Sequence, residues 1–437
     1  MNINKFSILI NFIKFRYFLK FKSRKKLEKY QDKKIKKHIK FLINNSKYYS
    51  QFAKDEINLN DFPIVDKRII MDNFDSINTV NVKKEDAFKV AIECEKSRNF
   101  TEKCSGLTVG LSSGTSGHRG LFLVSKKEQN LWVSNVLAKL LPKNKIFGHR
   151  VAFFLRADSN LYENANNFFI KFRYFDIYKS LDTYINELNG FSPTLLVAPS
   201  SVLLELSNFI FENKLRIYPE KIISIAEVLE SKDEGKIKKA FKKDIIHQVY
   251  QCTEGFLGYT CRCGNLHFNE DIVKLEKEYV GKNRFVPIIT DFFRTSQPII
   301  RYRLNDVIIE DNNSCKCGSK CLRIKAIEGR EDDIFIFKSR NGKEVNVFSD
   351  FIRRCFLFSC SIIQYRAVQV KCDLVKIFIE SKNFDLAKDE VLREFKKLSD
   401  ELDFEMPKFE FEKYFFDKSK KLKRVERIFK EDIYEKC

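Results

Sequence analysis

Strand-length apolar runs alternate with helical patterns from about residue 86 to residue 300, and this alternation constrains the fold more than any other feature of the chain. The expected strands are Val151–Leu155, Thr194–Ala198 and Ile222–Ala226. The expected helices are Lys179–Leu188, Ser200–Glu212 and Lys232–Lys242. Strands that alternate with helices indicate layers of helices packed on a sheet, which is the α/β class.

The pattern changes further along the chain. Three apolar runs then indicate antiparallel strands, at Ile272–Leu275, Val286–Thr290 and Val307–Ile309. After Arg330, short strand and helix patterns fill about a hundred residues, which is an ordinary domain size. We therefore predict a large multi-sheet α/β domain over residues 1–330 and a small, mobile α+β domain over residues 331–437. Within the large domain, Asn-Asn at 44–45 and Pro63 in a turn predict a loop-rich connector over residues 43–80.

The N-terminal segment, residues 1–42, is basic and aromatic. Lys and Arg cluster at residues 22–26 and 33–37. We expect a helical pair that packs on the large domain, and the alternative is a peripheral contact with an anionic membrane. No stretch approaches the ~20 apolar residues of a membrane span. No small-residue cleavage site follows the apolar run Phe6–Ile13, so a signal peptide is not expected.

The cysteine content and the net charge limit where the protein is expected to be and what it is expected to bind. Twelve cysteines without a signal sequence predict reduced thiols and a cytoplasmic protein. The formal net charge is +21, but outside the N-terminal segment Lys is interleaved with Asp and Glu. Specific nucleic-acid binding is therefore not expected. A generally positive field would favour ATP, CoA or an acidic carrier protein.

A glycine- and hydroxyl-rich loop joins two apolar runs, Leu107–Leu111 and Leu121–Ser125. It contains Ser112, Ser113, Gly114, Thr115, Ser116, Gly117 and Arg119. Its glycines let backbone N–H groups turn toward one point, and its hydroxyls add further donors. The loop is not a Walker loop, because the Gly-Lys-Ser/Thr ending is missing. It predicts a phosphate cradle between two strands, and a plain hairpin is the alternative.

Two cysteine clusters share the spacing Cys-x-Cys-Gly-x-x-(His/Cys). The first holds Cys261, Cys263 and His267, and the second holds Cys315, Cys317 and Cys321. Two such knuckles could place four sulfur and nitrogen ligands around one tetrahedral Zn²⁺. A fully used Cys-x-Cys would be strained, so some of the six positions must be spare. We predict a structural zinc drawn from Cys261, Cys263, His267, Cys315 and Cys317, and the alternative is reduced surface thiols.

Four further motifs follow the loop in a fixed order. They are Tyr250-Gln-Cys-Thr-Glu254-Gly, Arg301-Tyr-Arg-Leu-Asn-Asp306, Gly329-Arg330-Glu-Asp332-Asp333 and Lys420-Lys421-Leu-Lys423-Arg424. The ordered set spans nearly the whole chain and resembles the adenylate-forming (ANL, AMP-binding) superfamily of acyl-CoA synthetases. Within it, flanking phrases resemble the phenylacetate–CoA ligase and coenzyme F390 synthetase branch. Relatives in that branch carry a zinc bound mostly by Cys and His at the place of the cysteine knuckles.

The resemblance implies roles for individual residues. The loop, with Arg119, would hold the ATP phosphates. Tyr250 would lie against the adenine, Thr253 would offer a hydroxyl to phosphate, and Glu254 would bind Mg²⁺. Asp306 would grip the ribose hydroxyls, helped by Arg330. Lys421 would be the catalytic lysine of the small domain, within one or two positions in its lysine cluster, and Asp332 would be the hinge.

The implied function is ATP-dependent ligation. The enzyme would convert a small carboxylic acid to an acyl-AMP, release pyrophosphate, and pass the acyl group to CoA, a carrier-protein thiol or an amine. The alternatives are transfer of AMP to an acceptor hydroxyl, as in coenzyme F390 synthesis, and a basic zinc protein that binds nucleic acid. The last leaves the five ordered motifs unexplained. The acid and the acceptor are left open.

Overall fold

The computed structural model describes residues 3–429 except 98, 113–118, 144, 156–169, 358, 360 and 416–420. Contacts divide the chain into two compact units. The large unit comprises Met1–Leu304 and Ile309–Ala326, and the small unit comprises Asn305–Ile308 and Ile327–Cys437. No helix among the described residues is both long enough and apolar enough to cross a bilayer.

The large unit begins with two helical segments. Helix α1 (Ile3–Ile13) continues into a π-helical turn, η1 (Lys14–Phe18), and α2 (Arg24–Asn45) follows. Ser23 caps α2, because its side chain accepts a hydrogen bond from the backbone N–H of Lys26. Helix α1 packs on α7 (Lys126–Leu140), where the Ser134 hydroxyl donates to the Ile8 carbonyl at 3.0 Å.

Short helices lead to the first hairpin. They are α3 (Lys47–Ser50), η2 (Leu59–Asp61), α4 (Lys67–Asp72), α5 (Phe74–Ile77) and the longer α6 (Lys84–Ser97). We expected residues 43–80 to be mostly loop, but polar caps such as Ser46 and Asp66 begin helices there. Strands β1 (Thr108–Leu111) and β2 (Leu121–Val124) then pair antiparallel, with Leu111 opposite Leu121. The glycine-rich loop therefore joins two paired strands.

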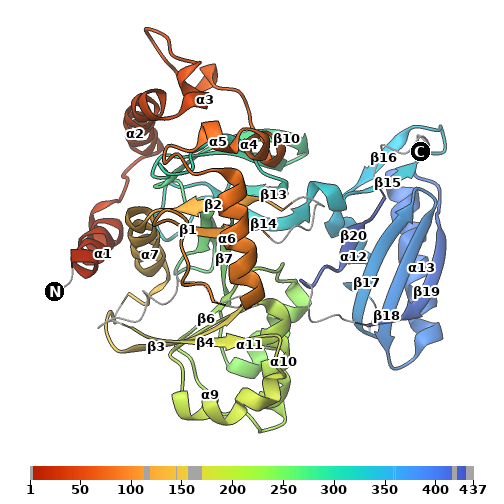
Figure 1. The fold of residues 1–437 in the computed structure, drawn as a ribbon. Helices are drawn as coiled ribbons and strands as arrows, with labels where there is room; N and C mark the ends of the chain where they lie inside the picture. The colour runs from red at the N-terminus through yellow and green to blue at the C-terminus, as the bar shows by residue number, and fades with distance from the viewer. Residues whose placement is uncertain are drawn as a thin grey trace. The chain divides into compact units, whose positions relative to one another are not determined.

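A twelve-stranded sheet forms the centre of the large unit (Figure 1). One half is parallel, in the order β4 (Ile170–Asp176), β3 (His149–Leu155), β5 (Leu195–Ala198), β6 (Lys221–Ser224) and β7 (His247–Cys252). Its helices are η3 (Leu181–Tyr184), α9 (Ile185–Phe191), α10 (Ser200–Phe211) and α11 (Ser231–Phe241). Residues of these strands and helices form one buried apolar cluster. The predicted helix Lys179–Leu188 is instead a 3₁₀ turn followed by a short α-helix.

The other half of the sheet is mainly antiparallel. It contains β8 (Gly255–Thr260), β9 (Leu266–Phe268), β10 (Val273–Gly281), β11 (Arg284–Asp291), β12 (Ile299–Arg303), β13 (Asp306–Asp311) and β14 (Arg323–Arg330). The direction changes at β7, which is parallel to β6 and antiparallel to β8. Thr253 and Glu254 occupy the tight turn between β7 and β8, at the carboxyl end of the last parallel strand.

The small unit is an α+β body with its own core. Its elements are η4 (Glu331–Asp333), β15 (Phe335–Lys338), β16 (Glu344–Val347), α12 (Ser349–Leu357), β17 (Ile362–Lys371), β18 (Leu374–Ser381), α13 (Phe384–Leu402), β19 (Lys408–Lys413) and β20 (Val425–Arg427). Four strands form a sheet in the order β19-β18-β17-β20, and buried aromatic side chains such as Phe395 fill the space beneath it. The predicted class, a large α/β unit with a smaller α+β unit, is confirmed. Cys372 is disulfide-bonded, which differs from the expectation that every thiol is reduced.

Candidate active site

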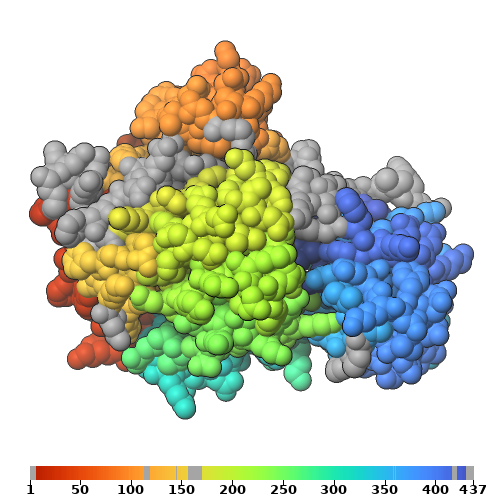
Figure 2. Space-filling model, turned by 90° about the horizontal axis from the view of Figure 1, so that it is seen from below, coloured from red at the N-terminus to blue at the C-terminus, as the bar shows by residue number. Residues whose placement is uncertain are grey.

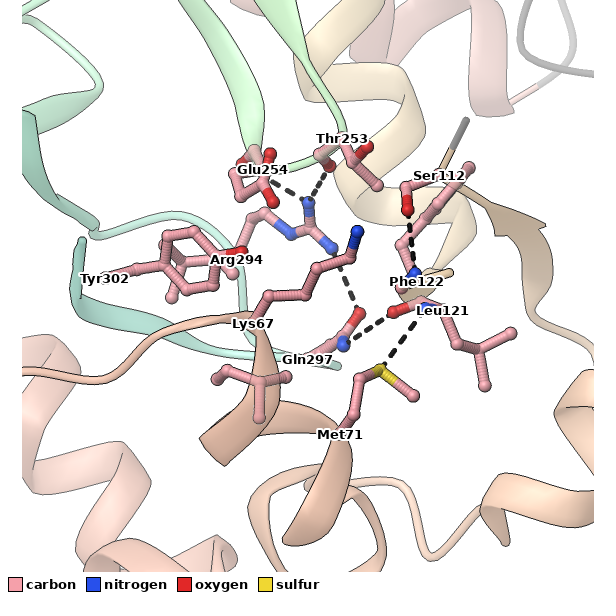
Figure 3. A pocket seen from close by; sticks show the side chains of 13 residues that line it. Lys67, Met71, Ser112, Leu121, Phe122, Thr253, Glu254, Arg294, Gln297 and Tyr302 are labelled. Atoms are coloured by element: carbon pink, nitrogen blue, oxygen red, sulfur yellow. Dashed lines mark hydrogen bonds between the residues drawn. The ribbon is translucent and has the colours of Figure 1, made fainter. Parts of the chain in front are cut away.

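A pocket in the large unit collects side chains from the motif that holds Thr253 and from three segments around it (Figure 3). It contains about 340 Å³ of empty space, part of which is open to solvent. The lining residues are Lys67, Ile70, Met71, Ser112, Gly120, Leu121, Phe122, Thr253, Glu254, Arg294, Gln297, Ile299 and Tyr302. One wall is therefore the base of the glycine-rich loop, and the facing wall is the turn after β7.

The base of the glycine-rich loop is pinned by two hydrogen bonds. The Ser112 N–H donates to the Gly120 carbonyl, and the Gly120 N–H donates to the Ser112 hydroxyl, each at 2.7 Å. A Cβ at position 120 would lie 2.9 Å from Cε of Lys67, so a larger residue there would have to displace the lysine side chain. Arg119 forms an ion pair with Glu95 on α6 and donates to the Ser112 carbonyl. The other predicted cradle residues, Ser113, Gly114, Thr115, Ser116 and Gly117, lie outside the described residues.

Arg294 holds the turn that carries Thr253 and Glu254. Its Nη1 donates to the Thr253 carbonyl at 3.0 Å and to the Glu254 carbonyl at 3.3 Å. Its Nη2 donates to the Leu123 carbonyl of β2 at 3.2 Å. One guanidinium group thus joins the two walls of the pocket. The fork geometry of arginine, with several donors in one plane, suits this bridging role.

Gln297, like Arg294, forms hydrogen bonds to the backbone of β2. Its Oε1 accepts from the Leu123 N–H at 2.9 Å, and its Nε2 donates to the Leu121 carbonyl at 3.0 Å. The side chain therefore behaves like one more residue of a strand beside β2. Arg294 and Gln297 were both missed in the sequence. The only signal was a polar stretch between β11 and β12, directly before Pro298.

Glu254 has a buried phenol as its neighbour. Tyr302 on β12 is 6% exposed, and its hydroxyl hydrogen-bonds to the Glu254 carboxylate. Burial, and then the charge of Glu254, raise the pKa of Tyr302 far above its usual range. The phenol stays protonated and donates, so it orients the carboxylate without neutralising its charge. Tyr302 lies in the motif that ends at Asp306, but the motif itself predicts no role for it.

Lys67 is, with Arg294, a cation of the pocket that the sequence did not predict. It is the first residue of α4, whose cap Asp66 accepts from the Ile69 N–H at 2.8 Å. Its side chain runs past Gly120 and points into the pocket, toward the side where Arg294 and Ser112 lie (Figure 3). A lysine at the start of a helix usually lies in solvent, so only the tertiary structure distinguishes this one.

Glu128 is a buried carboxylate that ties two segments of the site together. It lies in the capping box of α7 and accepts from the N–H and hydroxyl of Ser125, at 2.7 and 2.6 Å. It also accepts from the N–H groups of Thr295 and Ser296, at 2.5 and 2.8 Å. Although burial raises the pKa of Glu128, the hydrogen bonds from Ser125 and Ser296 outweigh it, and the net pKa is lowered. The segment with Arg294 is thus fixed to the start of α7.

The other residues predicted to bind the nucleotide are not among those that line this pocket. Tyr250 is buried on β7, its ring is 6.2 Å from the ring of Phe268, and it is not among the residues that line the pocket. Asp306 begins β13 and Arg330 ends β14, and both belong to the small unit. Beside them, the Asn305 amide donates to the Asp332 carboxylate at 2.5 Å.

The lysines of the cluster near the C-terminus differ in their contacts and in their exposure to solvent. Lys423 forms an ion pair with the buried Asp333 at 2.8 Å, within the small unit. Lys421 lies two residues earlier, in the segment that precedes β20, and is partly exposed. Lys418 and Lys420 lie outside the described residues. Lys423 therefore has a structural partner next to the predicted hinge.

The two cysteine knuckles meet in the large unit. One candidate ligand atom from each of Cys261, His267, Cys315 and Cys317 lies within 4.8 Å of the others. The sulfurs of Cys261 and Cys315 are 3.7 Å apart, and the Cys317 sulfur is 3.5 Å from His267 Nε2. Ligands ~2.0–2.3 Å from a tetrahedral zinc lie ~3.5–3.8 Å from one another, so this set fits the ion. Cys263 is exposed and lies outside the cluster.

The surroundings of the cluster match those of a metal site. The backbone N–H groups of Cys263, Cys317 and Ser319 donate to the sulfurs of Cys261, Cys315 and Cys317 respectively. Nδ1 of His267 is 3.2 Å from the Cys321 carbonyl, which can only accept. Nδ1 therefore carries the proton, and Nε2 keeps its lone pair toward the cysteines. Cys321 contributes its carbonyl to this arrangement rather than its sulfur.

Comparison with known sequences finds a similar protein over most of the chain. No family model matches the sequence. Protein CapK of Staphylococcus aureus is 25% identical over 405 residues, which cover 86% of this chain and 82% of that protein.

Several solved protein structures superpose on most of this chain. A 2-hydroxyisobutyryl-CoA ligase, solved in the postadenylation state with 2-HIB-AMP, superposes with a TM-score of 0.67, at 14% identity over 92% of this chain and 90% of that one. The GH3.15 acyl acid amido synthetase superposes with a TM-score of 0.55, at 13% identity over 88% of this chain and 86% of that one. The chain therefore has the fold of the adenylate-forming ligases, as its ordered motifs predicted.

Proposed function

We propose that the protein is an ATP-dependent adenylate-forming ligase that activates a small carboxylic acid. The observation that carries this proposal is the pocket. There the base of the glycine-rich loop faces the Thr253–Glu254 turn, with Lys67 and Arg294 between the two walls. A polyphosphate and a carboxylate repel each other, so a site that joins them needs hydroxyl donors, cations and a metal ligand at one place. This pocket offers all three.

The proposed reaction has two steps. In the first, a carboxylate oxygen of the acid attacks the α-phosphorus of ATP, the bond to the bridging oxygen breaks, and pyrophosphate leaves with an acyl-AMP remaining. In the second, a thiol or an amine attacks the acyl carbon and AMP leaves. CoA, a carrier-protein thiol and an amine all fit this second step. Ser112 and Thr253 would donate to phosphate oxygens, and Glu254, oriented by Tyr302, would hold Mg²⁺.

The residues outside the pocket complete the proposal. Asp306 and Arg330 would hold the ribose, and Lys421 would act in adenylate formation. Cys261, His267, Cys315 and Cys317 would hold a structural Zn²⁺, because four protein ligand atoms within 4.8 Å of one another could occupy all four positions around a tetrahedral ion. A screen of carboxylic acids for ATP-dependent pyrophosphate release, with hydroxylamine as a trap for the acyl group, tests the reaction class. Release without any hydroxamate would contradict acyl activation.

Loss of the metal ligand or of the ribose contact should impair the first step. Glu254→Gln keeps the shape of the side chain but weakens the Mg²⁺ ligand, and Asp306→Ala removes a carboxylate. Each should lower the rate of ATP-dependent pyrophosphate release by at least about a hundredfold, corresponding to roughly 2–4 kcal/mol of barrier. Glu56→Gln changes an exposed carboxylate of the large unit and should leave the rate unchanged. Parent-like rates in both active-site variants would show that the assignment is wrong.

Lys67 should contribute to binding an anionic substrate. Lys67→Met retains the aliphatic stem beside Gly120 and removes the charge. We expect the KM for the acid or for ATP to rise by about tenfold or more, because a charge-assisted hydrogen bond is lost. Lys67→Arg should recover much of the affinity. Steady-state pyrophosphate release with each substrate varied in turn measures both constants, and unchanged KM values for both would remove Lys67 from the site.

A further inference from the structure

The N-terminal helical segment has apolar side chains on two faces. Phe6, Ile10, Ile13 and Tyr17 recur at intervals of four, three and four residues, which places them on one face of α1 and η1. They are 53%, 49%, 38% and 47% exposed, and Phe18 beside them is 76% exposed. We call these five residues the outer stripe. The segment that bears them is at the surface of the large unit (red in Figure 2).

The opposite face holds the segment in place. Ile8, Phe12 and Phe15 are buried against the large unit. Arg16 donates from its guanidinium to the carbonyls of Ala138, Leu141 and Pro142, at 3.0, 2.9 and 2.6 Å, at the end of α7. The core of the protein therefore accounts for one apolar face of α1 and η1. It leaves the outer stripe uncovered on a helix whose orientation is fixed.

The charged side chains of the segment that bears the outer stripe are all of one sign. Residues 1–27 contain eight Lys or Arg side chains and no carboxylate. Lys14, Lys20 and Lys22 of this segment are exposed. Lys34 of α2 lies close enough to Lys14, Lys33 and Lys37 for their charges to lower its pKa, after the larger effect of its own burial. Lysines of α2 thus extend the positive field of α1, and both helices lie at one edge of the large unit (Figure 1).

We infer that the outer stripe and the lysines around it form a docking surface for an anionic phospholipid bilayer. Aromatic and aliphatic side chains on one helical face can enter the boundary between headgroups and acyl chains, while lysines contact lipid phosphates. The helix would lie along the surface rather than cross it, because α1 has only 11 residues. A second copy of the chain is a poorer occupant, since pairing two such surfaces would bring like charges together.

Vesicle flotation with the full-length protein tests the inference. Vesicles of phosphatidylcholine with 40% phosphatidylglycerol should float the protein at low salt, and vesicles of phosphatidylcholine alone should bind it at least about tenfold less. Ile10→Ser combined with Ile13→Ser should weaken binding to the anionic vesicles by about tenfold or more. Lys20→Glu combined with Lys22→Glu should do the same, and binding of the parent should fall with added salt.

Matched controls separate lipid docking from other causes. Tyr218 is 79% exposed, so Tyr218→Ser removes a comparable side chain outside the segment and should bind vesicles like the parent. The thermal midpoints of all variants should match the parent within a few degrees. The inference is overturned if anionic vesicles do not bind the parent, or if the double serine variant binds them equally well. It is also overturned if that variant instead converts a dimer to a monomer, since the stripe would then be a contact between copies.

Discussion

Lys421→Ala should lower the rate of adenylate formation by at least about a hundredfold, while the variant still uses a chemically supplied acyl-adenylate. A cation is needed where negative charge develops between the acid and the α-phosphate, and it is not needed when a thiol or an amine attacks an adenylate already made. Two measurements check this: pyrophosphate release from acid and ATP, and AMP release from supplied acyl-AMP with the acceptor present. Lys382→Ala removes an exposed lysine of the small unit and should behave like the parent in both.

Lys423 supplies a second comparison within the same cluster. Its ammonium group pairs with the buried Asp333, so Lys423→Ala leaves a buried carboxylate without its partner. That variant should lower the thermal stability of the small unit, whereas Lys421→Ala should not. Equal loss of both half-reactions in Lys421→Ala would contradict a role confined to adenylation. Selective loss of adenylation in Lys423→Ala, with the parent's stability, would move the catalytic role to that residue.

The proposed hinge predicts the opposite pattern. If the small unit turns about Asp332 between the two steps, Asp332→Pro fixes φ at the pivot without removing an ATP contact. It should form the adenylate and fail to transfer the acyl group. Asp332→Ala keeps backbone freedom and removes the hydrogen bond from Asn305, so it separates the backbone effect from the side-chain effect. Transfer at the parent's rate in Asp332→Pro would remove the hinge from that position.

Cys315→Ser should abolish metal binding and destabilise the large unit. Protein purified without chelator should contain about one equivalent of Zn²⁺, measured by elemental analysis. The variant should contain none, and its thermal midpoint should fall by about 10 °C or more, because metal binding contributes to the folding free energy. The effect is expected to be large because Cys261 and Cys315 are separated by 54 residues, so the ion would close a long loop.

Cys263→Ser is the matched control for the zinc site. Cys263 lies in the same knuckle as Cys261 but is exposed and outside the cluster. This variant should keep its zinc and its thermal midpoint. Absence of metal from the parent protein would contradict the site. Loss of zinc in Cys263→Ser to the same degree as in Cys315→Ser would show that the ligand set is wrong.

The fold was predictable because its signals are local and ordered. The apolar run at Thr194–Ala198 became β5, and Ser200–Glu212 became α10 almost to the residue. Proline directly before the helix and a continuous apolar run for a buried strand are features of the chain itself. The short helices of residues 43–80 were missed because single capping residues began them, without a long periodic pattern.

The site was only partly predictable from the sequence. Thr253 and Glu254 belong to a sequence motif that marked them as candidate site residues, and they line the pocket. Arg294 and Lys67 carry no such signal, because their roles depend on carbonyls and side chains that are distant in the sequence. The cysteine spacing indicated six possible metal ligands. The cluster includes His267 and leaves out Cys263 because of the course of β8 and β9, which spacing alone does not describe.

Glu128 gives the pocket a dependence on proton concentration at a position that touches no reactant. Its carboxylate accepts from both α7 and the segment that carries Arg294, and it can do so fully only while ionised. Because its folded-state pKa is lowered, the free energy that it contributes is fully present above the ordinary pKa of Glu and is lost as pH falls through the lowered value. Proton uptake there would release the segment that joins the two walls. Acid would thus act on the pocket by linkage through a structural carboxylate.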